Sequence, residues 1–361
     1  MIPLRATRSA LSALLLLCFA ATSPALAGDK PVIATVDDMP RHSYPVTCTV
    51  VDLMKDDAAF EALAAAVEKD LLAIHEGYEI ADPSAQQGVL STLRGLAMMR
   101  GDAAAVRGYT ATIRELEDKE ALKLTNGQFY MAILDARDEL GADAADADVQ
   151  AKVQALLAER YGAMDWAVVG DIVESTKGSM EIYSDNLLMG IVQSQIDPAV
   201  AKTGTLSSDQ AERVVGIQAT RLVTLQYKDA IIAALSGVVA ANRVEKQDIW
   251  AARNAAFTGD EGHHPVRLGI WDSGVDVEVF PGQVFINPRE TVDGKDDDGN
   301  GFVDDRHGIG YDVNWVPDPP VLYDLGEAAA RRAELEDQSK GFTDVRSSID
   351  SEEASALKRK L

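Results

Sequence analysis

The chain has 361 residues, with 34 lysines and arginines against 58 aspartates and glutamates, and a formal net charge of −24. This length suffices for two domains whose cores need no metal or disulfide bridge. The negative charge argues against binding to nucleic acid or anionic lipid, and it is compatible with calcium.

The first 27 residues have the features of a secretory signal peptide. Arg5 and Arg8 precede a short apolar run, and Ala25 and Ala27 form a small-residue cleavage signal. We expect cleavage after Ala27 and a secreted or periplasmic protein. No later stretch reads as a membrane-spanning helix, so we predict no membrane anchor.

Residues 28–257 are predicted to form a helical region, either a bundle or a short α-solenoid. Apolar residues recur there at helical spacing, as in Phe60, Leu63, Val67, Leu71 and Ile74. Asp82 and Pro83 predict a helix start, and Gly101 predicts a stop. A later helix is expected to open near Asp209, with Glu212 completing a capping box. This region is a possible surface for a protein partner, and it lacks a pattern that indicates catalysis.

Residues 258–265 are rich in Gly, Asp and Pro and predict a linker. The apolar run that follows, from Val266 to Trp271, predicts a buried strand that ends at Asp272. A carboxylate at the carboxyl end of such a strand lies where open parallel sheets collect functional groups. Taken alone, the tripeptide Asp-Ser-Gly is also a common turn.

The residues that follow favour a functional role for Asp272 over a simple turn, because a second motif lies at a set distance after it. The sequence from Phe285 to Val313 reads FINPRETVDGKDDDGNGFVDDRHGIGYDV. Together with Asp272, this resembles the aspartate segment of the subtilisin-like serine proteases. The matching positions are Asp272, Ser273, Gly274, Val275, Asp276, Asn287, Glu290, Asp296, Asp297, Asp298, Gly299, Asn300, Gly301, Phe302, Val303, Asp304, Asp305 and Gly308.

The resemblance implies that residues 266–324 begin an α/β parallel-sheet peptidase domain acting on proteins or peptides. Asp272 would be the aspartate of an Asp-His-Ser triad, and the chemistry would require no cofactor. The family's His-Gly-Thr-His and Gly-Thr-Ser elements do not occur in this sequence. We therefore expect the native chain to continue past Leu361, with residues 325–361 as a charged helical insertion, and we expect no activity from these 361 residues alone.

The acidic run also resembles the opening of a calcium loop. Asp296, Asp298 and Asn300 alternate as oxygen ligands before Gly301, and Asp304 occupies the ninth place. His307 stands where an EF-hand would have its glutamate, so a complete EF-hand is not expected. The acidic run is therefore either a partial calcium site or an acidic surface turn.

Two other functions compete with the serine protease. Asp-Ser-Gly after an apolar pair is also typical of aspartic proteases, but these need a second such carboxylate, and the chain has no second copy of the tripeptide. The other alternative is an exported helical interaction module that carries a degenerate protease-like tail.

Overall fold

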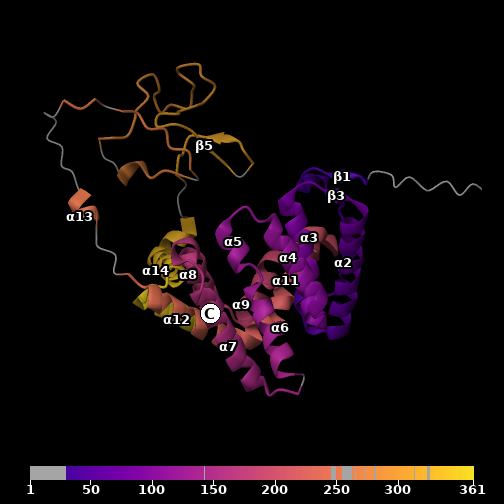
Figure 1. The fold of residues 1–361 in the computed structure, drawn as a ribbon. Helices are drawn as coiled ribbons and strands as arrows, with labels where there is room; N and C mark the ends of the chain where they lie inside the picture. The colour runs from indigo at the N-terminus through magenta and orange to yellow at the C-terminus, as the bar shows by residue number, and fades with distance from the viewer. Residues whose placement is uncertain are drawn as a thin grey trace, which may run out of the picture. The chain divides into compact units, whose positions relative to one another are not determined.

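The computed structural model describes residues 30–361 except 142, 245–248, 254–261, 265, 273, 280–281, 313 and 323–325, and it leaves out the side chains of Trp250 and Ala251. The described chain is mostly helical, as predicted (Figure 1). The expected signal peptide, most of the expected linker and Ser273 lie outside the described residues.

Contacts divide the chain into two compact units. The first extends to Asn126 and also includes Gly190–Val223, and the second comprises Gly127–Met189 and Thr224–Leu361. The predicted helical region of residues 28–257 is therefore shared between the two units.

In the first unit, local sequence signals set the ends of the helices. Helix α2, Asp57–Gly77, buries the whole predicted apolar stripe. Helix α3, Pro83–Arg100, starts as predicted, because the Asp82 carboxylate accepts hydrogen bonds from two backbone N–H groups of the first turn. It ends at Gly101, whose φ of 75° is left-handed and favours glycine.

Helix α11 begins near Asp209 as predicted, but its capping box lies two residues earlier in the sequence than predicted. The helix spans Ser208–Leu222, and its capping box joins Ser207 to Gln210. Glu212 faces the interior of the unit instead, where its carboxylate accepts a hydrogen bond from the Thr92 hydroxyl at 3.3 Å.

Two short strand pairs complete the first unit. Strand β1 pairs with β3 in parallel, and β2 pairs with β4 in an antiparallel register. The bounds of these strands and of the other elements in this unit are β1 Val32–Ile33, a 3-10 turn Val36–Asp38, β2 Ser43–Pro45, α1 Val50–Lys55, β3 Glu79–Ile80, α4 Ala103–Leu116, α5 Glu120–Thr125, a π-helical turn Val192–Ile196, α10 Asp197–Thr203 and β4 Thr205–Ser207.

The second unit has its helical core around α12, Lys228–Asn242, which packs against α7, Asp146–Gly162, and α8, Trp166–Ile182. Helix α9, Asp185–Ile191, crosses the boundary between the units. The other elements are α6 Gln128–Leu140, α13 Trp250–Arg253, β5 Gly310–Tyr311, β6 Pro317–Asp318, α14 Arg332–Arg346, α15 Glu352–Lys360 and the 3-10 turns Thr224–Tyr227, Val277–Val279 and Gly326–Arg331.

Helices α14 and α15 confirm the predicted helical character for the described residues 326–361. Helix α15 opens at Ser351, with glutamates in its first turn and basic residues in its last, which suits the helix dipole. The two helices pack against α8: Lys358 forms an ion pair with Glu181 at 2.8 Å, and the Ser184 hydroxyl donates to the carbonyl of Leu361 at 2.8 Å.

One stretch of the described chain is long and apolar enough to cross a membrane, contrary to the sequence-based expectation. It is Ser208–Asn242, with a mean hydropathy of 1.4. Its apolar character comes from α11 and α12, which supply buried side chains to the cores of the two units. Core helices of soluble proteins have the same composition, so this stretch is weak evidence for a membrane span.

Candidate functional site

The predicted strand before Asp272 was wrong. Residues 266–271 form no strand, and Val266, Leu268 and Trp271 are 80%, 84% and 100% exposed. A parallel strand is stable only between neighbouring strands. Within the described residues of this segment, the only paired strands are β5 and β6, of two residues each, and they pair with each other.

After Asp272 the chain is held by a distant part of the same segment. The backbone N–H of Val275 donates to the carbonyl of Val321 at 2.8 Å. Before Asp272, the Arg267 guanidinium lies over the Phe285 ring at 5.0 Å. Asp272 therefore lies on a segment that contacts residues 285 and 321, although it does not end a strand.

Residues 285–312, called here the acidic loop, fold around their own carboxylates. Gly294, Gly299 and Gly301 have φ angles of 82°, 72° and 95°, which turn the chain sharply. The Asp296 carboxylate accepts three backbone N–H groups, from residues 299, 300 and 301, at 2.7 to 3.1 Å. Asp296 thus holds the turn at residues 299–301.

The ends of the acidic loop are joined by Asn287. Its backbone N–H donates to the carbonyl of Arg306 at 2.8 Å, and its side-chain amide donates to Asp298 at 3.1 Å. Asn300 donates to Asp305 at 3.0 Å on the other side of the turn. The motif residues therefore form one hydrogen-bonded unit.

Glu290 is the buried carboxylate of the acidic loop, with 6% of its surface exposed. Its Oε1 accepts the backbone N–H groups of Asp297 and Asp298 at 3.1 and 3.0 Å. Its Oε2 is buried and has no hydrogen-bond partner among the described residues. Burial raises the pKa of Glu290, and the nearby charges of Asp298 and Asp305 raise it further, against the opposing effect of the backbone donors.

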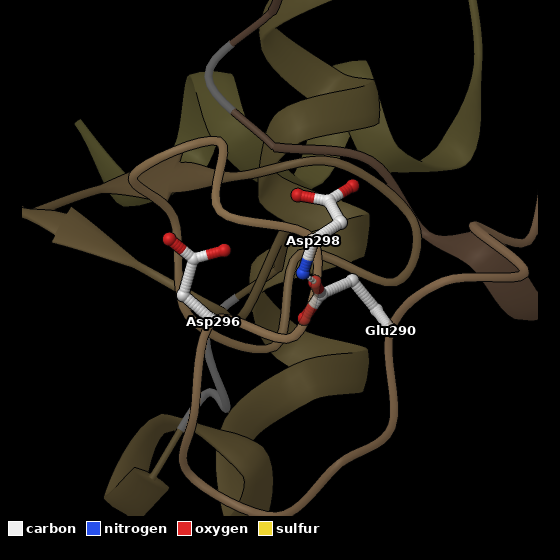
Figure 2. Close-up of side chains that lie close together, drawn as sticks. All are labelled: Glu290, Asp296 and Asp298. Atoms are coloured by element: carbon white, nitrogen blue, oxygen red, sulfur yellow. Dashed lines mark hydrogen bonds between the residues drawn. The ribbon is translucent and has the colours of Figure 1, made fainter.

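Glu290, Asp296 and Asp298 come together in space. One carboxylate oxygen from each lies within 4.8 Å of the others, and this is the one such grouping of potential metal ligands in the described part of the chain. Figure 2 shows the Glu290 side chain extending toward the backbone of Asp298, with Asp296 on the opposite side.

The structure thus gathers two of the four predicted calcium ligands, Asp296 and Asp298, and adds Glu290. The Asn300 side-chain oxygen accepts the backbone N–H of Phe302 at 2.8 Å. Asp304 accepts the N–H groups of residues 293 and 294 at 3.0 to 3.1 Å. The side chains of Asn300 and Asp304 therefore stabilise turns of the loop by hydrogen bonds to its backbone.

The sequence analysis singled out Glu290 as a position of the family resemblance. It did not predict Glu290 as a metal ligand, because the calcium-loop spacing does not include this residue. His307 bonds through Nδ1 to the carbonyl of Phe285 at 2.9 Å, so it closes the loop rather than joining the carboxylates. Three carboxylates with no histidine or thiolate among them offer a site for a hard cation. No family model, curated protein or solved structure matches this chain.

Proposed function

We propose that residues 266–324 are the aspartate segment of an exported subtilisin-like serine endopeptidase. The observation that carries the proposal is the acidic loop. Asn287, Asp296 and Asp298, which are among the positions that carry the family resemblance, are also joined to one another or to the loop backbone by hydrogen bonds.

In the proposed enzyme, Asp272 accepts a hydrogen bond from the imidazole of a catalytic histidine. The carboxylate fixes the tautomer that can take a proton from the serine hydroxyl, and it stabilises the imidazolium that forms. The histidine then protonates the leaving amine of the peptide substrate. Within these 361 residues only the aspartate of this triad is present, because neither the histidine nor the serine element occurs in the sequence.

The exposed run before Asp272 supports the same proposal. The run Val266–Trp271 exposes four apolar side chains around Arg267, and this exposure is costly in water. Strands supplied by the histidine and serine elements would cover it.

The test compares peptidase activity in the product of the complete reading frame with that of the 361-residue chain. We expect no fluorophosphonate labelling of the 361-residue chain, and labelling of a longer product that carries both elements. In that product Asp272→Asn should lower turnover by a factor of about 10⁴, because the amide favours the wrong imidazole tautomer. Asp276→Asn is the matched control and should keep most of the activity. Full activity in Asp272→Asn would contradict the proposal.

A second candidate is an exported helical interaction module, favoured by where the core lies. Among the described residues, none of the buried apolar side chains falls between residues 240 and 344, so the helices form their cores without the Asp272 segment. This alternative predicts that no product of the gene has peptidase activity, while Asp272→Asn leaves the folded helical units and their thermal stability unchanged.

A further inference from the structure

The run Val266–Trp271 is an exposed apolar segment whose backbone is unpaired. Its four apolar side chains are 63% to 100% exposed. Among the described residues, no hydrogen bond joins the backbone of residues 266–271 to another backbone group. An apolar run with unpaired N–H and C=O groups is a template on which another strand can pair.

The order of residues in this run gives it one apolar face. Successive side chains of an extended strand point to opposite sides, so every second residue shares a face. Val266, Leu268 and Ile270 therefore lie on one side of the extended run. His264 and Asp272 have the same parity and continue this face at its two ends.

We propose that the run pairs in antiparallel register with the same run of a second copy of the chain, about a two-fold axis at Leu268. In this register Val266 lies opposite Ile270 of the second copy, and the two Leu268 side chains lie opposite each other. His264, which can carry a positive charge, lies opposite the carboxylate of Asp272.

The run is complementary to its own reverse, and this feature selects a second copy as the partner. The proposed register puts Arg267 opposite Gly269, so the two guanidinium groups do not face each other. Other registers are less favourable. A shift of two residues in one direction places Arg267 opposite Arg267, and the opposite shift places Val266 opposite Asp272. A shift of one residue puts the two apolar sets on opposite faces.

The association should be weak and independent of the proposed protease. Two strands of six residues bury less than the roughly 1,000 Å² of a stable interface, so we expect a dissociation constant on the order of 10 to 100 µM. The pairing needs no peptidase activity, so its failure and that of the proposed function are distinguishable. In a longer product, strands from the histidine and serine elements would compete for the run.

The experiment is sedimentation equilibrium of residues 28–361, the form expected after signal cleavage, at about 1 to 500 µM, which brackets the expected constant. We expect a monomer–dimer equilibrium. Leu268→Glu and Leu268→Lys should each weaken it about tenfold or more, because like charges meet on the axis. An equimolar mixture of the two variants should regain the dimer. Val244→Glu, at a site that is 75% exposed and outside the run, should associate as the wild type does.

Cross-linking tests the register. In a Cys48→Ser background, which removes the one cysteine of residues 28–361, Leu268→Cys should form a disulfide-linked dimer on oxidation. Val266→Cys should not, because the two copies of residue 266 lie four positions apart along the pair, or about 13 Å. A wild type that stays monomeric over the whole concentration range would overturn the proposal. Equal cross-linking of both cysteine variants, or a mixture of the charged variants that stays monomeric, would also overturn it.

Discussion

Glu212 in the first unit makes the stability of the protein depend on pH. Burial raises the pKa of its carboxyl group, Asp209 adds to the effect, and the hydrogen bond from Thr92 opposes it. The folded state therefore holds this proton more tightly than the unfolded state does. Stability should be greatest below the unfolded pKa of about 4.3, and it should fall as pH rises through the higher folded pKa.

Replacing Glu212 with Gln should remove the loss of stability at high pH, because the amide stays neutral. Its oxygen can still accept the hydrogen bond from Thr92. We expect a higher melting temperature than wild type at pH 7, and a difference that shrinks at pH 4 and below. Asp209→Asn, on the exposed side of the same helix, should give no gain at pH 7, since it removes a favourable charge at a helix N-terminus. Equal pH profiles for Glu212→Gln and wild type would contradict this account.

At the level of residues, the sequence identified functional groups where their spacing is local. Asp296 and Asp298 alternate along one turn, and their meeting follows from that spacing. Glu290 meets them only because the chain turns back at Gly294, which spacing cannot reveal. Ser207 and Asp209 are both good capping residues, and the choice between them depends on where β4 ends.

Among the secondary-structure elements, Gly178 on α8 allows a close approach of α14 in the second unit. A Cβ atom added there would lie 2.2 Å from the carbonyl oxygen of Val345 on α14. Gly178→Ala should therefore push α14 away from α8 and destabilise the protein by about 1 to 3 kcal/mol. Denaturant unfolding followed by circular dichroism measures this loss.

The control for this change is Gly237→Ala on α12. A Cβ atom there would meet nothing within 4 Å, so the alanine should stabilise the helix by roughly 0.5 to 1 kcal/mol. The opposite signs of the two substitutions test the packing rather than helix propensity. A stabilised Gly178→Ala would mean that α14 does not approach α8 this closely.

The helices were predictable because their apolar stripes and end signals are local, as α2 and α3 illustrate. The absence of a strand at Val266–Trp271 was not predictable, since a strand forms only with partners and the apolar run does not show whether partners are present. Helices α14 and α15 were expected from composition and charge order. Their packing on α8 was not, because it depends on a glycine more than 150 residues earlier in the chain.

For the whole molecule, the packing of α14 and α15 on α8 means that the chain leaves the helical core before the Asp272 segment and returns to it afterwards. Val345, Ala354 and Leu357 form a buried apolar cluster with Ile182 at the end of α8. The Lys358–Glu181 ion pair borders it. The helical region therefore contacts α14 and α15 as well as being joined to the Asp272 segment, which is unlike a pro-segment joined by a single connection.

A cut before the Asp272 segment should consequently leave the two pieces associated. We would insert a site-specific protease sequence between Gly262 and His263, cleave the folded protein and apply it to a gel-filtration column. The fragments should elute together in native buffer and separate in denaturant, because burial of the apolar cluster holds α14 and α15 on α8. Glu181→Ala should weaken this association, since it leaves Lys358 without its partner at a partly buried position. Separation of the wild-type fragments in native buffer would show that the helical region is held only by the linker.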